Sequence, residues 1–399
     1  MKILMITPYV PYPPSSGGQI RTLNLLKYLS VKNEITLVCL YKFDEEKKHL
    51  AQLQPYCKKI YFCRRPKKPW TGKTILGSFF SLKPFLIVRN FSEEAKTILS
   101  TLFRQKNFDV IHVETFYVMP HLPKVKTPVL LVEQTIEYKV YQHFVKSLPL
   151  LIQPFFFIDI IKLKYWERYY WTKASLVATV SQSDKELIKN LQPQIDPVII
   201  PNGAGDDMLI KTISKRNLTN PILLFQGNFL WLQNTEAASI LINKILPILK
   251  TEIKKFKLII AGQSATKKLN IRNNQYLEIV DIPYNKNNLV RNLYQKATLF
   301  IAPIYGPGGT RLKILAAMAN GLPVISTRIG ISGLDVNNNI SVLIAETPNE
   351  FVVKIKKILS QPATYYKIQN EAFQLVKNKY NWMKIAANLE VVYHQLIRT

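Results

Sequence analysis

The chain has 399 residues, 47% of them hydrophobic, and a formal net charge of +28. This length is enough for two domains, and this hydrophobic fraction excludes an intrinsically disordered chain. The positive charge favours anionic partners such as nucleic acid, anionic lipid or phosphorylated substrates, although a compositional bias towards Lys and Asn is an alternative explanation.

The three cysteines, Cys39, Cys57 and Cys63, match no metal-binding spacing and are typical of a reducing compartment. A disulfide between Cys57 and Cys63 is the less favoured alternative. The N-terminal segment does not have the pattern of a signal peptide, because its apolar run is short and is interrupted by prolines. The most apolar stretch, 148–161, is shorter than the ~20 residues of a membrane span and contains Asp159. We therefore expect a cytoplasmic protein.

The first half of the chain alternates strand and helix patterns. Apolar runs predict strands at 2–7, 34–40, around 61, 109–113, 128–133, 175–181 and 197–201. A helix is expected at 19–30, and 140–172 forms a long helical region rich in aromatic residues. The alternation predicts a parallel sheet. The first loop contains Gly17-Gly18 but not the GxGxxG fingerprint of dinucleotide-binding proteins.

The second half repeats this pattern after a polar, linker-like segment at 211–220. Strands are predicted at 222–228, 257–263, 276–281, 298–304 and 322–327, with a helix at 234–251. The residues from Asn381 predict a lone amphipathic helix. These patterns predict two α/β domains, each with an open parallel sheet that binds ligands beyond the carboxyl ends of its strands.

The segment GPGGTRLKILAAMANG at 306–321 carries the clearest chemical signal. Its apolar residues predict a nearly buried helix with Thr310 as N-cap and a stop at Asn320-Gly321. Gly308 and Gly309 allow close approach of backbone or ligand. Free N–H groups and the helix dipole then make an anion site at the first turn.

Two cations lie where this helix dipole disfavours them. Arg311 and Lys313 are in the predicted first turn, and a bound diphosphate would make their positions favourable. The alternative is a Gly-rich turn whose two cations simply reach solvent. Gly17 and Gly18 before the first-domain helix, with Arg21 one turn later, repeat this arrangement, and Ser15 and Ser16 offer capping hydroxyls.

These stretches resemble the family 4 (group 1) glycosyltransferases of the GT-B type. The C-terminal motif of one bacterial branch reads roughly G-x-G-T-R-x-K-I-L-E-A-M-A-x-G-x-P-V-V-S-T, and this chain has GPGGTRLKILAAMANGLPVIST at 306–327. Other matching stretches are 7–21, 181–188, 199–209, 225–238 and 381–396. The resemblance implies two Rossmann-like, doubly wound domains at 1–205 and 206–380 that face each other across a cleft. The last helix, 381–399, would cross back to the N-terminal domain.

The same resemblance implies transfer of a hexose from a UDP- or GDP-sugar to a lipid-linked or polysaccharide acceptor. We expect retention of anomeric configuration, no cofactor and no metal, because no DxD motif is present and the helix terminus with its cations can stabilise the leaving diphosphate. The implied donor-binding residues are Gly227, Asn228, Asp281, Ile282, Pro283, Gly308, Gly309, Thr310, Arg311 and Lys313.

The candidate catalytic residues are Glu137, Gln134 and Arg311. Gly17, Gly18, Arg21 and Glu114 are assigned to the acceptor or phosphate side. Glu114, Glu133 and Glu137 are candidates for contacts to acceptor hydroxyls, with strand-end carboxylates that face solvent as the alternative. His112, within a strand pattern, is expected to be a core histidine.

Three positions depart from the family pattern. Gly308 and Ala316 stand where many relatives have glutamates, and Gln134 replaces a histidine, so it can form hydrogen bonds but cannot titrate. A catalytically inactive GT-B binding protein or partner subunit of another transferase is therefore the second hypothesis. A sugar-nucleotide epimerase is disfavoured by the G-T-R-x-K motif, and nucleic-acid binding is disfavoured because no recognised module is present.

The aromatic and basic residues of 144–171, together with the basic run at 64–68, allow two interpretations. They could form an interfacial helix on anionic lipid, which would make the enzyme peripheral on the inner face of the cell membrane. They could instead pack as core helices on the sheet.

Overall fold

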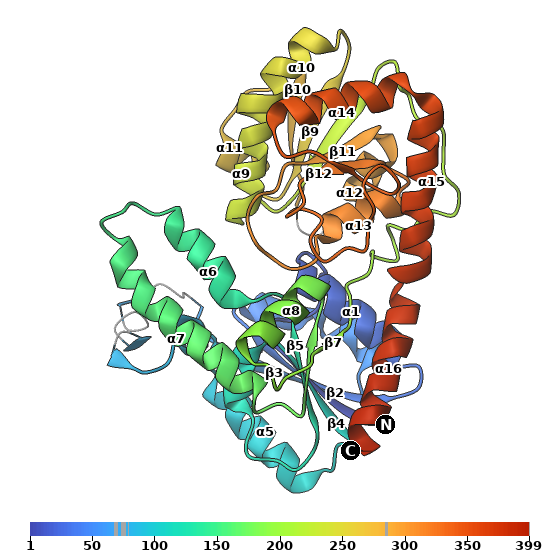
Figure 1. Cartoon of the computed structure of the whole chain (residues 1–399). Helices are drawn as coiled ribbons and strands as arrows, with labels where there is room; N and C mark the ends of the chain where they lie inside the picture. The colour runs from blue at the N-terminus through green and yellow to red at the C-terminus, as the bar shows by residue number, and fades with distance from the viewer. Residues whose placement is uncertain (68–70, 73–76, 79, 284–285, 399) are drawn as a thin grey trace. The chain divides into compact units, whose positions relative to one another are not determined.

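The computed structural model describes residues 1–67, 71–72, 77–78, 80–283 and 286–398, so Lys68 of the basic run lies outside the described residues. The chain forms two compact units (Figure 1). Unit 1 contains Met1–Pro201 and Ile385–Thr399, and unit 2 contains Asn202–Lys384. The boundaries lie within a few residues of those expected at 205 and 381.

Unit 1 is built on a seven-stranded sheet with the order β3-β2-β1-β4-β5-β6-β7, in which the paired strands run parallel. Its central strands are almost wholly buried, because helices cover both faces of a parallel sheet and leave no polar face. The strands are β1 (Lys2–Thr7), β2 (Glu34–Tyr41), β3 (Lys59–Arg64), β4 (Val110–Glu114), β5 (Val129–Glu133), β6 (Leu176–Thr179) and β7 (Val198–Ile199).

The helices of unit 1 follow its strands along the chain. They are α1 (Gly17–Leu29), α2 (Leu50–Leu53), α4 (Phe85–Asn90), α5 (Glu93–Gln105), α6 (Glu137–Lys146), α7 (Gln153–Trp171) and α8 (Gln182–Leu191), with the 3-10 segments η1 (Asp44–His49), η2 (Gln54–Tyr56) and η3 (Phe116–His121). The last helix, α16 (Trp382–Arg398), buries Leu389 and Tyr393, and its residues from Ile385 belong to unit 1. The three cysteines are buried and free, so Cys57 and Cys63 do not pair.

Unit 2 has a six-stranded parallel sheet with the order β10-β9-β8-β11-β12-β13. The strands are β8 (Ile222–Gln226), β9 (Lys257–Gly262), β10 (Leu277–Asp281), β11 (Leu299–Ala302), β12 (Val324–Ser326) and β13 (Leu343–Ile344). The helices are α9 (Leu232–Ile240), α10 (Leu246–Glu252), α11 (Ala265–Leu269), α12 (Asn287–Lys296), α13 (Leu312–Ala319), α14 (Pro348–Ser360) and α15 (Pro362–Lys379).

The single helix expected at 234–251 is interrupted. A π-helical turn, η4 (Leu241–Ile245), separates α9 from α10, and Pro247 lies in the first turn of α10. Proline has no backbone N–H to donate to the preceding turn, so the hydrogen-bond pattern shifts there. Among the described residues, no helix combines the length and the apolar character that crossing a bilayer would require.

Candidate functional site

The central strands of unit 2 bring two sequence motifs to the same sheet edge. β8 and β11 are neighbours, and the strand order reverses direction between them. The loops that follow them, 227–231 and 303–311, therefore open at the carboxyl edge of the sheet, at the switch point where open parallel sheets bind ligands. Gln233 of α9 also reaches the second loop, because its side-chain amide donates to the Pro307 carbonyl at 3.3 Å.

The helix after the second loop begins later than predicted. α13 spans Leu312–Ala319, and Arg311 rather than Thr310 occupies its N-cap position, without a side-chain cap. The stop at Asn320-Gly321 is confirmed, with Gly321 in the left-handed region at φ 64°. The Ile314 N–H donates to the Arg311 carbonyl at 2.8 Å. The N–H groups at the very start of a helix have no intrahelical acceptor.

Arg311 folds back over its own loop. Its Nη2 donates to the Gly306 carbonyl at 2.7 Å. Gly308 has φ 151°, and a Cβ on it would lie 2.3 Å from Nη1 of Arg311. Gly308 is therefore required both for the backbone conformation and for the close approach of the guanidinium. This packing explains why the helix starts only after Arg311.

Lys313, in the first turn of α13, contacts the loop 227–231 and the start of α9. Its amine is hydrogen-bonded to Oδ1 of Asn234 and lies 4.8 Å from the centre of the Phe225 ring. A Cβ on Gly227 would stand 2.9 Å from Nζ of Lys313, so these two predicted donor-binding residues lie side by side. Burial, and to a smaller extent the Arg311 charge, lower the pKa of Lys313 to about 7. Arg311 and Lys313 are both half-buried, and each is held by a hydrogen bond within unit 2.

The 227–231 loop is held by residues that the sequence analysis did not single out. Asn234 donates to the Asn228 carbonyl, and Asn228 donates to Oε1 of Gln263, each at 2.6 Å. Gly262 has φ 148°, and a Cβ there would lie 1.7 Å from the Gly227 carbonyl oxygen. The signal for Gly262 is present in the sequence, since a glycine ends the apolar run 257–262 that neighbours β8.

Asp281, Ile282 and Pro283 follow β10, which lies two strands away from β8. Oδ1 of Asp281 accepts from the Thr266 N–H at 3.2 Å, and its other oxygen contacts the Thr266 hydroxyl. Ile282 is buried and donates to the Gly262 carbonyl at 3.0 Å, whereas Pro283 is exposed. Their assignment to a nucleotide base stays a prediction.

In unit 1, the loop after β1 leads into α1 with the expected glycines at its start. Gly17 is the first helical residue, and the Ser16 side chain accepts from the Gln19 N–H, so Ser16 is the cap. A Cβ on Gly18 would lie 2.4 Å from the Tyr9 hydroxyl and 2.8 Å from Oε1 of Gln134. Gly18 therefore allows two polar side chains from other segments to approach α1 closely.

Arg21 and Glu114 form a fully buried ion pair, with Nε and Oε1 3.2 Å apart. Arg21 also donates through Nη1 to the carbonyls of Ile200 and Pro201, at 3.1 and 3.2 Å. The Arg21 guanidinium thus lies within unit 1. It links α1 to β4 and to the backbone of residues 200–201, which follow β7. Its assignment to the phosphate side stays a prediction.

Glu114 also contacts the side chains of His112 and Gln134. Nε2 of His112 lies 2.9 Å from Oε1, and Nε2 of Gln134 donates to Oε2 at 2.6 Å. Burial alone would raise the pKa of Glu114, but the Arg21 charge and the hydrogen bonds from His112 and Gln134 lower it to about 2. The solvent-facing alternative for Glu114 is therefore wrong. His112 is a buried core residue, as expected, and its Nδ1 lies 2.5 Å from the Tyr393 hydroxyl.

A second group of carboxylates lies where β5 leads into α6. Glu133 is buried and accepts from the Trp171 indole at 2.9 Å, which excludes the solvent-facing alternative for it. Glu167, which the sequence analysis missed, is also buried and accepts from the N–H groups of Glu137 and Tyr138 at 2.8 and 3.2 Å. Glu167 of α7 therefore caps the first turn of α6.

Burial controls the ionisation of this group. It raises the pKa of Glu137 to about 7, with a small opposing effect from the Arg89 charge. Burial, and to a smaller extent repulsion from neighbouring carboxylates, raises the pKa of Glu133 and of Glu167 well above the usual range. Glu137 is the half-buried member of the three. It is therefore the carboxylate best placed to exchange a proton near neutral pH.

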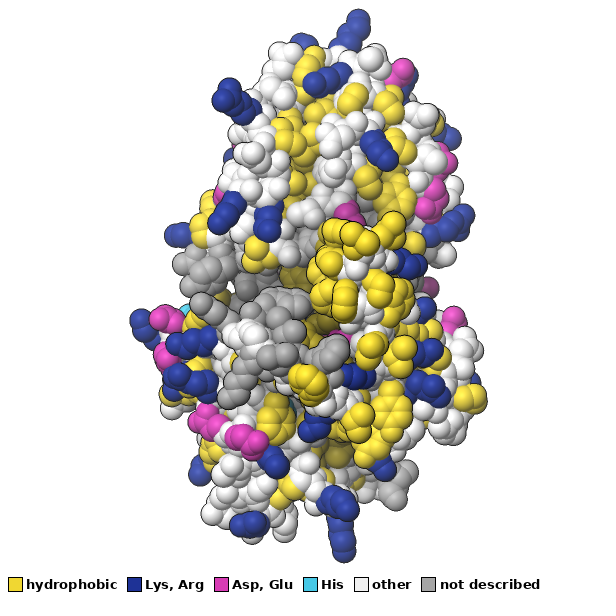
Figure 2. All heavy atoms as spheres, turned by 90° about the vertical axis from the view of Figure 1, so that its left-hand side faces the viewer, with side chains coloured by type: hydrophobic (Ala, Val, Ile, Leu, Met, Phe, Trp, Pro, Cys, Tyr) yellow, Lys and Arg dark blue, Asp and Glu magenta, His cyan; other side chains and the backbone are white. Residues whose placement is uncertain are grey.

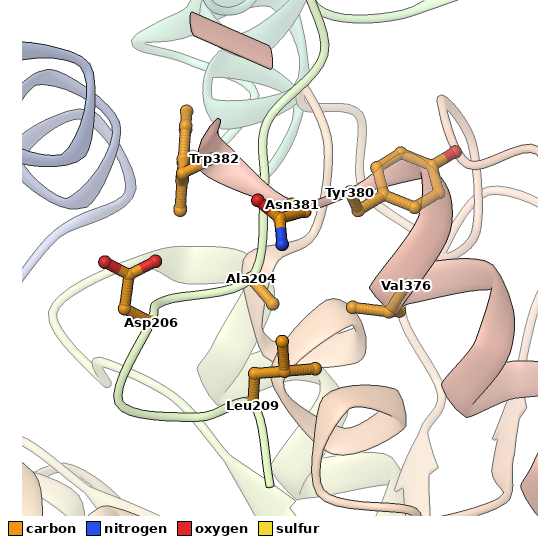
Figure 3. A pocket seen from close by; sticks show the side chains of 7 residues that line it. All are labelled: Ala204, Asp206, Leu209, Val376, Tyr380, Asn381 and Trp382. Atoms are coloured by element: carbon orange, nitrogen blue, oxygen red, sulfur yellow. The ribbon is translucent and has the colours of Figure 1, made fainter. Parts of the chain in front are cut away.

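A small pocket in unit 2 lies apart from these loops, at the segments where the chain enters and leaves the unit. It is lined by Ala204, Asp206, Leu209, Val376, Tyr380, Asn381 and Trp382, as Figure 3 shows. A Cβ on Gly203 would lie 2.9 Å from the Trp382 ring, so the indole packs directly on the backbone. None of the predicted site residues lines this pocket.

Comparison with known proteins identifies part of the chain. Residues 220–361 match the family model described as Glycosyl transferases group 1. Unit 2 carries a group 1 glycosyltransferase domain. This matched region contains all the residues predicted to bind a donor.

A relative and several solved structures extend the comparison to the whole chain. The relative is an uncharacterized 44.6 kDa protein in the cps region of Klebsiella pneumoniae, 24% identical, with 97% of this chain and 98% of the relative covered. Sucrose-phosphate synthase from Thermosynechococcus elongatus is 14% identical, with a TM-score of 0.72 and coverage of 100% and 99% of the two chains. Anabaena HepE in complex with UDP-glucose is 13% identical, with a TM-score of 0.66 and coverage of 99% and 100%. The chain has the GT-B fold.

Proposed function

We propose that the chain transfers a hexose from a UDP- or GDP-sugar to a lipid-linked or polysaccharide acceptor on the cytoplasmic side of the membrane. Retention of anomeric configuration and independence from metal are parts of the proposal. The group 1 glycosyltransferase domain supports the reaction class. The place of the relative in a cps region supports a polysaccharide product.

The donor half of the proposal depends on one observation, the position of the Lys313 amine beside Gly227 at the start of α13. The first-turn N–H groups and the amine would bind the diphosphate, and the Arg311 guanidinium would fix the loop around it. These groups would stabilise the negative charge that develops on the leaving diphosphate, which is the role that a metal ion has in other transferases. UDP bound to the Anabaena neighbour supports a uridine nucleotide as the first donor to test.

Titration of the purified chain with UDP and GDP, followed by thermal unfolding, tests donor binding. We expect stabilisation by a nucleotide diphosphate, and loss of most of it in Lys313→Met. Without ligand, Lys313→Met should unfold at a higher temperature than the native chain, because a buried ammonium group is removed. Lys377→Met, which removes an exposed lysine of α15, is the matched control. No stabilisation of the native chain by any nucleotide diphosphate would reject the donor assignment.

The second candidate function is an inactive binding protein. It rests on Ala316, which is half-buried on the accessible side of α13, one turn after Leu312, and offers no carboxylate there. Release of nucleotide diphosphate from UDP- and GDP-sugars distinguishes the two functions. Turnover by the native chain supports the transferase. Donor binding without turnover, unchanged in Ala316→Glu, supports the inactive protein.

A further inference from the structure

The long helix α7 is apolar on two opposite faces. One face is buried in unit 1 and contains Ile160, Leu163, Glu167 and Trp171. The other face exposes Ile158, Ile161, Tyr165 and Tyr169, which recur at helical spacing. A helix that is apolar all round is normally buried on all sides, in a protein core or in lipid. Among the described residues of unit 1, none buries the exposed side chains of this face of α7.

The segment that enters α7 extends this face. Leu150 is 81% exposed, Leu151 is 89% exposed and Phe155 is 72% exposed. Figure 2, which faces this side of the molecule, shows hydrophobic side chains gathered together there. We call this set the α7 surface; it consists of Leu150, Leu151, Ile152, Phe155, Phe157, Ile158, Ile161, Tyr165 and Tyr169. Clustered side chains of this size on a soluble unit indicate a binding surface.

The exposed charges of the segment 138–173, which contains α7 and most of α6, have one sign. Residues 138–173 contain six cationic side chains, which are Lys139, Lys146, Lys162, Lys164, Arg168 and Lys173. The two carboxylates of this stretch are withdrawn from the surface. Glu167 is buried, and Asp159 accepts from the Phe85 N–H at 2.8 Å and from the Ser78 hydroxyl at 3.2 Å. Lys139, Lys146 and Lys173 are exposed, whereas Lys162 and Arg168 donate to backbone carbonyls within unit 1. An apolar face with exposed cations on the same segment matches the interface of a bilayer that contains anionic lipid.

We propose that the α7 surface docks on an anionic membrane, with Leu150, Leu151 and Phe155 inserted among the acyl chains. This inference deepens the proposed function and rests on it for one consequence, namely that a lipid-linked acceptor reaches the enzyme from this side. α6 packs on α7 and begins with Glu137. A helix of ten residues is about 15 Å long, so the proposed acceptor-side carboxylate lies one short helix away from the α6–α7 connection.

Co-sedimentation of the full chain with vesicles tests the docking. We expect binding to vesicles of phosphatidylcholine with 30% phosphatidylglycerol, and at least tenfold weaker binding to pure phosphatidylcholine. The double variant Leu151→Ser with Phe155→Ser should bind the anionic vesicles at least tenfold more weakly than the native chain. Val31→Ser with Val353→Ser is the matched control, because these valines are 77% and 60% exposed outside the α7 surface. It should bind like the native chain.

Unfolding temperatures and nucleotide binding of the same samples distinguish lost docking from lost folding and from failure of the transferase function. Equal unfolding temperatures for the two double variants would show that lost binding does not come from lost folding. Equal vesicle binding by them would overturn the proposal, as would a native dimer that only the Leu151–Phe155 variant dissociates, since a second copy would then occupy the surface. UDP and GDP binding is measured on the same samples. Lost nucleotide binding with intact vesicle binding would reject the transferase function and leave the docking standing.

Discussion

Lys313 and Glu137 are two titratable side chains whose pKa values burial moves to about 7 from opposite directions. Lys313 would carry its charge only when the solution is mildly acidic or when an anion is bound beside it. Glu137 would lose its proton only as the solution becomes neutral. Each group can therefore change its protonation state when a ligand arrives, which is a common property of functional sites.

The role of Glu137 as a base can be tested by the pH dependence of the transfer rate. If its carboxylate accepts the proton of the acceptor hydroxyl, the transfer rate should rise with pH and reach a plateau above about 7, because only the ionised form is a base. Glu137→Gln should lower kcat by about 10² or more and remove this pH dependence, with nucleotide binding unchanged. The control is Glu186→Gln, an exposed glutamate of α8 in the same unit. An unchanged pH profile in Glu137→Gln would refute the role.

Residue types at the site could be predicted from the sequence, but their neighbours could not. The glycines, Arg311 and Lys313 are visible in the 306–321 motif, and Gly227 is visible at a strand end. The contact of Lys313 with Asn234 and Gly227 depends on the pairing of β8 with β11, which no local pattern specifies. For the same reason the burial of Arg21 and Glu114 could not be foreseen.

At the scale of elements, the carboxyl ends of β8 and β9 in unit 2 are held by a close backbone contact between Gly262 and Gly227. The Gly262 backbone passes so close to the Gly227 carbonyl that any side chain would collide with it. The strands β8 and β9 can therefore end in register only with glycine at this position. The sequence predicts both strands but does not reveal this contact.

Gly262→Ala should displace the 227–231 loop and impair nucleotide diphosphate binding. The added Cβ would stand 1.7 Å from a backbone oxygen at a φ of 148°, so the strand must move. We expect nucleotide affinity to fall at least tenfold and the unfolding temperature to fall as well. Gly77→Ala is the control, because a Cβ there meets nothing within 4 Å. Native affinity in Gly262→Ala would show that the loop tolerates the shift.

The element boundaries show where local patterns fail. The helix predicted from Thr310 begins at Leu312, because Arg311 leaves helical geometry to bond with Gly306. The helix predicted at 234–251 is broken by a π turn next to Pro247. Both differences come from particular side chains. The strand alternation depends on burial over many residues and was predicted well.

At the scale of the whole molecule, unit 1 is completed by the last residues of the chain. Tyr393 and Leu389 of α16 are fully buried, and Glu390 accepts from the Asn33 side chain at 2.9 Å. The sequence predicts this final helix, and the family resemblance predicts its return to the first domain. In the structure, Ile385–Thr399 belongs to unit 1.

A chain that ends at Lys384 should lose stability in unit 1 but not in unit 2. Each large apolar side chain removed from the core costs about 1.5–3 kcal/mol, so Leu389 and Tyr393 together should cost about 3–6 kcal/mol. Hydrogen exchange resolves the two units, and the amides of β4 should exchange much faster while those of β11 do not. A chain that ends at Ile397 is the control. Equal loss of protection in β4 and β11 would contradict the assignment of the last residues to unit 1 alone.

The buried Glu133–Glu167 pair has a consequence for the heat of folding. Because burial raises the pKa of both carboxyls in the folded unit, folding takes up protons from the buffer wherever the pH lies between the unfolded and folded pKa values of the pair. Calorimetric enthalpies of unfolding measured in that pH range should then differ between buffers of different ionisation heat, such as phosphate and Tris.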